Sequence, residues 1–122
     1  NKTLCFPASA DSIPTSLGQE DHVSMGSISG RKLYQILDNL EYILAIELMS
    51  ACQAIEFRKP LKSSALLEAA HSFVRQTVSF ANEDRIFADD INQIKKIISD
   101  FSFMHHVEEK QKLNKGFEEF EL

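Results

Sequence analysis

The chain has 122 residues, of which 43% are hydrophobic and 25% charged, as expected for one globular domain with a modest core. Its formal net charge of −5 disfavours broad nucleic-acid binding, because a phosphate backbone selects for a basic surface. Two cysteines are too few for a disulfide framework. The longest apolar stretch, 42–51, is interrupted by Glu47 and is too short to span a bilayer, and no signal-peptide pattern opens the chain. We therefore expect a cytoplasmic protein with no membrane partner.

The first thirty residues differ in composition from the rest of the chain. They contain two of the three prolines and three of the four glycines, and no apolar period of 2 or 3.6 persists in them. We expect an irregular loop over 1–30. Compact domains rarely carry a loop of this length unless it is functional or lacks the segments that it packs against.

A long helix is predicted after this loop. Apolar residues recur at helical spacing from Leu33 to Ile55, without an internal Gly or Pro. Ser27 or Ser29 would cap its start, and Pro60 predicts an end near Phe57. Between 43 and 54 the apolar residues lie on nearly every face, which is typical of a helix buried on all sides. Two short companion helices could not cover it.

Two shorter helices follow in the predicted order of elements. The first runs over 64–80 with Ser63 or Ser64 as its cap, and the second begins after Asp89 or Asp90, whose carboxylates suit a helix N-terminus. From Met104 the chain turns polar, and we expect a tail that is partly helical at most. The fold class is therefore all-α, with a long central helix and two shorter helices after an irregular loop. We divide the chain into 1–30, 31–103 and 104–122.

Glu20, Asp21 and His22 form the most concentrated set of titratable groups. They make a poor metal site, because three successive side chains in a loop rarely converge on one ion, so no metal is expected. Acid–base chemistry fits Glu and His better, although a charged loop before a helix is usually solvated surface. The start of the long helix at 25–30 would favour a negative charge nearby.

The remaining candidates have simpler interpretations. Cys52 lies within an apolar helical pattern, so we expect a buried free thiol and not a nucleophile. His71 falls on the polar margin of its helix and is expected at the surface. The adjacent pair His105 and His106 would diverge by about 100° on a helix and is also expected at the surface.

The loop resembles a segment of the aromatic amino acid ammonia-lyase family, in the branch that acts on histidine. The similarity covers roughly residues 1 to 98, as part of the C-terminal region of such a protein. The segments that carry it are Asn1–Leu4, Pro7–Ser9, Asp11–Ser16, Gln19–Gly26, Leu44–Glu47, Ala51–Ala54, Arg58-Lys59 with Leu61–Ser64, and Asp84-Arg85 with Phe87-Ala88.

The resemblance implies elimination of ammonia from L-histidine to give trans-urocanate, by a mostly helical homotetramer whose active sites combine several subunits. It matches Glu20 to the family glutamate near the substrate imidazole, with Gln19, Asp21 and His22 supporting it. The branch specific for phenylalanine or tyrosine usually has Asn-Gln-Asp where this chain has Gln19-Glu20-Asp21. A carboxylate suits a ring with N–H donors, whereas a phenyl ring offers it nothing.

The departures from the family limit this expectation. The family electrophile, a methylidene-imidazolone (MIO) group, forms from an Ala-Ser-Gly tripeptide, and none occurs in the 122 residues. The chain alone is therefore expected to be inactive, with the electrophile and a catalytic tyrosine in a missing N-terminal part. Two alternatives remain: a non-catalytic helical interaction or oligomerisation module, and a lyase for another aromatic amino acid.

Overall fold

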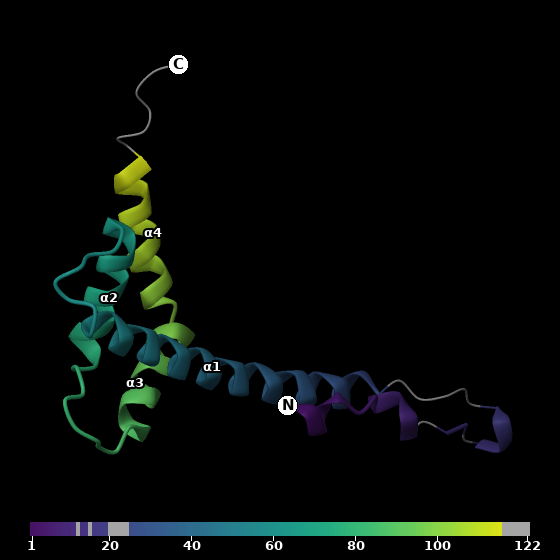
Figure 1. The fold of residues 1–122 in the computed structure, drawn as a ribbon. Helices are drawn as coiled ribbons and strands as arrows, with labels where there is room; N and C mark the ends of the chain where they lie inside the picture. Colours follow the sequence, from purple (N-terminus) through teal and green to yellow (C-terminus); the bar gives the residue numbers. More distant parts are fainter. Residues whose placement is uncertain (12, 15, 20–24, 116–122) are drawn as a thin grey trace. The chain divides into compact units, whose positions relative to one another are not determined.

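The structure is a computed structural model that describes residues 1–11, 13–14, 16–19 and 25–115. All its regular elements are helices (Figure 1), which confirms the predicted all-α class. Three short 3-10 helices precede four α-helices: η1 Lys2–Cys5, η2 Ala8–Asp11, η3 Ser16–Gly18, α1 Gly26–Glu56, α2 Ala65–Thr77, α3 Ala88–Ser99 and α4 Ser102–Lys115. The chain divides into two compact units, Asn1–Leu40 and Glu41–Leu122.

In the first unit, the N-terminal segment contacts the first half of α1. Lys32 Nζ donates to the carbonyl of Phe6 at 2.5 Å, and Asn39 Nδ2 donates to Asn1 Oδ1 at 2.9 Å. The segment is not wholly irregular as predicted, since short 3-10 turns punctuate it. These turns are too short to show a period in the sequence.

Helix α1 begins earlier than the serine caps predicted. The amides of Ile28 and Ser29 both donate to the carbonyl of Met25, at 3.1 and 3.0 Å. Ser27 and Ser29 therefore lie inside the first turn and do not cap it, so that prediction was wrong. The end at Glu56 agrees with the prediction from Pro60.

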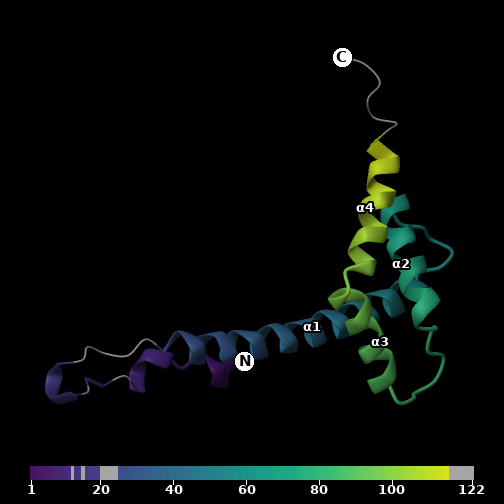
Figure 2. The same cartoon turned by 180° about the vertical axis from the view of Figure 1, so that it is seen from behind.

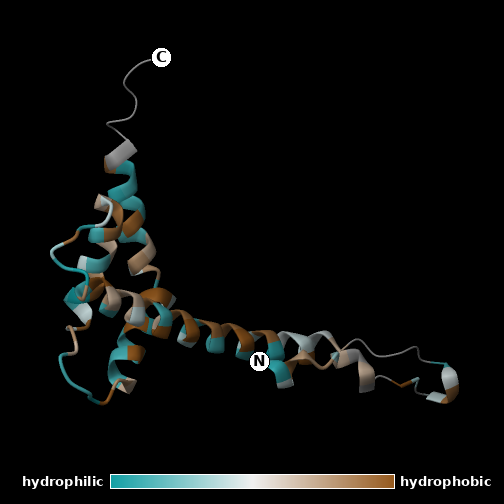
Figure 3. Cartoon of the chain, viewed as in Figure 1, coloured by the Kyte–Doolittle hydropathy of each residue, from teal (hydrophilic) through white to brown (hydrophobic). Residues whose placement is uncertain are grey.

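In the second unit, the later part of α1 contributes to a small core shared with α2 and α3. Its buried members are Ala45, Cys52, Val74, Val78 and Ile94. Helix α2 packs beside α4, as both ribbon views show (Figures 1 and 2). The core is small, and many apolar side chains of α1 stay outside it; apolar residues recur along much of this helix in Figure 3.

The ends of α2 and α3 differ from their predicted positions by a few residues. Ser64 caps α2 as expected, because its Oγ accepts from the amide of Leu67 at 3.4 Å. Helix α2 stops at Thr77, since Val78 adopts an extended backbone. Helix α3 begins at Ala88, so Asp89 and Asp90 lie in its first turn, where their charges suit the helix dipole without capping it.

Helix α4 covers part of the segment predicted as a polar, partly helical tail from Met104, and it packs against α2. Its apolar side is narrow but contacts α2: the ring of Phe73 lies 6.3 Å from that of Phe103 and stacks on His106 at 4.6 Å with an interplanar angle of 22°. His106 is therefore half-buried and not a surface residue. The high charge of 108–112 concealed this contact in the sequence, because tertiary packing stabilises a helix more than its composition does.

No α-helix within the described ranges combines the length and the apolar character that a membrane span requires.

Candidate functional site

The predicted site residues, Gln19 to His22, precede α1 in the sequence. Gln19 is described and exposed, and its amide donates to the carbonyl of Ser16 at 3.0 Å. Glu20, Asp21 and His22 lie outside the described residues, so their predicted roles stay predictions. The structure therefore describes the residues on either side of the segment 20–24 and not the segment itself.

The backbone before Gln19 is strained. Ser16, Leu17 and Gly18 have φ values of 53°, 60° and 82°, and only glycine adopts this region at no steric cost. Leu17 is fully exposed, so apolar packing does not compensate for the strain. Strained backbone is often found at functional sites, and this strain immediately precedes the segment that the sequence singled out.

On the other flank, α1 begins at Gly26, and only Met25 separates it from the segment 20–24. The first amides of a helix have no partners within the helix, and the dipole adds a partial positive charge. A carboxylate of the protein or of a small molecule is stabilised by such an end. The backbone at 16–18 thus allows a sharp turn, and the N-terminus of α1 stabilises a negative charge.

A cluster of charged groups joins α1 to α2, and sequence reasoning missed it. Glu56 Oε1 lies 3.1 Å from His71 Nε2 and 3.2 Å from Arg75 Nε, while Glu56 Oε2 lies 2.5 Å from Lys59 Nζ. The hydrogen bond from Lys59 is the main cause that holds the pKa of Glu56 below its ordinary value. His71 and Arg75 follow Glu56 by 15 and 19 residues in the sequence, so these two contacts become visible only when α1 and α2 pack together.

His71 is buried, with 7% of its surface exposed, so its predicted surface position was wrong. It shares one face of α2 with the buried Val74, at position i+3. The contact to Glu56 has the distance of an ion pair but not the geometry of a hydrogen bond. Nε2 thus has no hydrogen-bond partner among the described residues.

Cys52 lies one turn before Glu56 and is 2% exposed, which confirms the predicted buried thiol. Burial raises the pKa of this thiol; Arg75 opposes the shift and Glu56 adds to it. Because the nucleophile is the thiolate, such a thiol is inert. In the described part of the chain, no group of three or more His, Cys, Asp or Glu side chains could hold a metal ion.

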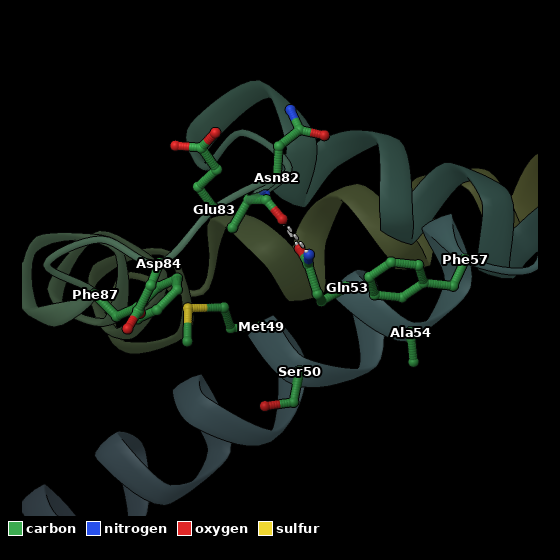
Figure 4. Close-up of a pocket in the computed structure, with 10 residues that line it drawn as sticks. Met49, Ser50, Gln53, Ala54, Phe57, Asn82, Glu83, Asp84 and Phe87 are labelled. Carbon is green, nitrogen blue, oxygen red and sulfur yellow. Dashed lines mark hydrogen bonds between the residues drawn. The ribbon is translucent and has the colours of Figure 1, made fainter.

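A hollow of about 590 Å³ lies between α1 and the loop before α3 (Figure 4). Gln53 fixes this loop: its Nε2 donates to the carbonyl of Ala81 at 2.7 Å, and its Oε1 accepts from the amide of Ala81 at 3.3 Å. The loop is also braced by Arg85, whose Nη2 donates to the carbonyl of Ser79 at 2.9 Å and contacts Asp90 at 2.8 Å. The hollow is lined by Met49, Ser50, Gln53, Ala54, Phe57, Ala81, Asn82, Glu83, Asp84 and Phe87.

Helix α1 exposes a row of large apolar side chains. In the first unit Leu33, Leu37 and Leu40 are 55%, 50% and 42% exposed. In the second unit Ile43 and Leu44 are 53% and 41% exposed. The leucines at 33, 37, 40 and 44 follow the alternating spacing of 4 and 3 that suits contact with another helix. Apolar patches of this kind mark interaction surfaces.

Comparison with known proteins places the chain in a family. A family model described as aromatic amino acid lyase matches residues 1–76. A histidine ammonia-lyase of Desulfotalea psychrophila (strain LSv54 / DSM 12343) is 52% identical over 107 residues, which is 88% of this chain and 21% of that protein. The crystal structure of histidine ammonia-lyase from Trypanosoma cruzi is similar with a TM-score of 0.82 and 43% identity, over 88% of this chain and 21% of that one.

A tyrosine aminomutase from Streptomyces globisporus has a similar structure, with a TM-score of 0.77 and 34% identity over 84% of this chain and 20% of that one. The chain thus spans about a fifth of the length of the relatives it matches. The match to the family model covers more than half of the chain, and the relatives' sequences agree with it. The chain therefore belongs to the aromatic amino acid lyase family.

Proposed function

We propose that the chain is part of an ammonia-lyase that eliminates ammonia from L-histidine to give trans-urocanate. The observation that carries this proposal is the 52% identity to a relative named histidine ammonia-lyase. The segment Gln19–His22 agrees with this proposal, since its Glu20 matches a glutamate of the histidine branch of the family. Because the chain spans about a fifth of that relative, the activity belongs to a longer parent protein.

Within this proposal, Glu20 acts on the substrate imidazole. An ionised carboxylate only accepts hydrogen bonds, and an imidazole N–H donates one, so Glu20 would hold the ring and take part in proton movement. Gln19, Asp21 and His22 would support Glu20 from the same segment. The positive end of α1 at Gly26 would favour the negative charge of such a site.

The MIO electrophile would lie in the part of the parent beyond this chain. It forms from Ala-Ser-Gly, and the 122 residues contain no such tripeptide. When present, it supplies the electron-poor centre that labilises the amino group. The residues here would bind and orient the ring and carry a proton, so the chain alone would be inactive.

We also propose that residues 1–30 contribute an active-site segment and residues 31–103 a C-terminal helical region of a homotetramer. The exposed leucines of α1 support this assembly, because covering such a row with another helix removes apolar surface from water. Residues 104–122 would form a polar tail that is helical in part, since α4 runs from Ser102 to Lys115. A cytoplasmic location stays a prediction.

The substrate is the point at which rival proposals differ. A tyrosine aminomutase shares the fold, so the fold alone does not select histidine. The names of the relatives do not favour a non-catalytic helical module. The deciding experiment offers L-histidine and L-phenylalanine in turn to the full-length parent and follows product absorbance in the ultraviolet. Urocanate from histidine is expected; cinnamate from phenylalanine without urocanate would overturn the choice.

A further inference from the structure

The connection between α1 and α2 encloses a small hollow of about 270 Å³, lined by Ile55, Arg58, Leu61, Lys62 and Ser63. Backbone hydrogen bonds define the connection: the amide of Arg58 donates to the carbonyl of Ile55 at 3.0 Å, and the amide of Leu61 donates to the carbonyl of Arg58 at 3.0 Å. The hollow is smaller than the range of about 300–1,000 Å³ typical of drug-sized ligands. It suits a small group.

Two cations line this hollow without an internal counter-charge. Among the residues that the structure describes, the side chains of Arg58 and Lys62 form no hydrogen bond or ion pair. Lys59 behaves differently, since its ammonium pairs with Glu56. Basic residues after a helix also interact with its dipole, and Lys59 is placed to do so. Arg58 and Lys62 therefore give this hollow a local positive charge, although the whole chain has a net charge of −5.

The polar side chains of the hollow specify the class of anion. Arg58 and Lys62 only donate hydrogen bonds, and the hydroxyl of Ser63 can donate as well. A guanidinium fork, an ammonium and a hydroxyl are the donors that proteins use for phosphate oxygens. Ile55 and Leu61 add apolar walls. We propose that this hollow binds a phosphate group, either free phosphate or a phosphate monoester.

One acidic residue beside the hollow limits the affinity. Glu68 Oε1 accepts from the amide of Ser63 at 2.7 Å, so this amide is already engaged, and the carboxylate lies in the first turn of α2. The helix dipole offsets part of its charge. Because the cations are exposed, solvent screens them, and the expected dissociation constant for inorganic phosphate is in the millimolar range.

The test uses the full 122-residue chain and titrates it with inorganic phosphate at constant ionic strength, followed by amide chemical shifts. The variant R58Q/K62Q removes both cations. The variant K110Q/K112Q removes the same charge from exposed lysines of α4, which have no ion pair with any described residue. Circular dichroism verifies that both variants stay folded.

We expect saturable shifts at 55–63 and a dissociation constant raised about tenfold or more in R58Q/K62Q, since each lost charge contact costs up to about fivefold. In K110Q/K112Q the constant should stay within twofold. Absence of saturable binding, or equal weakening in both variants, would overturn the site. This outcome is independent of the proposed lyase activity, which the titration does not measure.

Two further ligands separate the sources of the phosphate group. Phenyl phosphate should bind more tightly than inorganic phosphate if a monoester rests its body on Ile55 and Leu61. Equal or weaker binding of phenyl phosphate assigns the hollow to the free ion. Acetate is the planar control: if acetate binds as tightly as phosphate, the hollow selects charge alone and the proposed phosphate site is wrong.

Discussion

Glu56 Oε1 lies 3.1 Å from Nε2 of His71, across the junction of α1 and α2. The same carboxylate also contacts the guanidinium of Arg75 and the ammonium of Lys59, so it lies within ion-pair distance of three side chains. Arg75 Nη1 also donates to the carbonyl of Val78 at 3.2 Å, where α2 ends. The cluster therefore links the end of α1 to both the middle and the end of α2.

The variant Glu56→Gln should destabilise the second unit by about 1–3 kcal/mol, because it leaves partly buried donors without their charged acceptor. Chemical denaturation followed by circular dichroism measures this change. Glu109→Gln on the exposed side of α4 is the matched control and should alter the free energy of unfolding by less than about 0.5 kcal/mol. Equal effects of the two variants would contradict a stabilising role for the cluster.

The same carboxylate predicts a dependence of stability on pH. The hydrogen bond from Lys59 is the largest cause that lowers the pKa of Glu56 from its ordinary value of 4.5. A group whose folded pKa is lowered stabilises the fold above its unfolded pKa, and this contribution is lost as the pH falls through the folded value. The difference in melting temperature between wild type and Glu56→Gln should therefore be full at pH 7 and shrink below pH 4.5. A constant difference down to pH 3 would contradict this.

The helices that the sequence predicted well have a strong apolar period or a clear cap. Leu33 to Ile55 and the Ser64 cap depend on local rules of spacing and hydrogen bonding, so α1 and α2 could be placed within a few residues. Helix α4 could not, because its stability depends on the rings of Phe73, Phe103 and His106 meeting across α2 and α4.

The site divides in the same way. A run such as Gln19–His22 is visible in the sequence through its resemblance to a family. Contacts such as Glu56 with His71 need two helices to meet, and the hollow with Arg58 and Lys62 needs a turn to close. The periodicity of a sequence indicates the face of the helix on which a residue lies, but it does not indicate which residue of a neighbouring helix will contact it.

The contact of Phe73 with α4 gives a further prediction. Phe73→Ala removes the ring that stacks on His106 and lies against Phe103, so α4 should loosen and stability should fall by about 1–3 kcal/mol. Hydrogen exchange of the α4 amides is the measurement. Leu113→Ala, at a side chain 65% exposed on the same helix, is the control and should leave their protection intact. Unchanged protection in Phe73→Ala would mean that α4 does not depend on this contact.

The exposed row on α1 predicts self-association of the isolated chain. Burial of side chains such as Leu37 and Leu40, which are 50% and 42% exposed, drives two helices together. Sedimentation velocity should show species larger than a monomer that decrease on dilution. Leu37→Lys combined with Leu40→Lys should shift the chain toward monomer, whereas Leu113→Lys should not. A wild-type chain that is monomeric at every concentration would refute the association.

The proposed lyase function makes its sharpest prediction at Glu20. In the full-length parent, Glu20→Gln keeps the size of the side chain but removes the charge, so it should lower histidine turnover by about 100-fold or more, the range of a positioned proton carrier. The circular dichroism spectrum and the melting temperature should stay close to those of wild type, because the change affects chemistry and not packing. Glu108→Gln on α4 is the control and should turn over histidine at the wild-type rate. If Glu20→Gln also retains that rate, Glu20 takes no part in the chemistry, and the imidazole must be recognised by other residues of the parent.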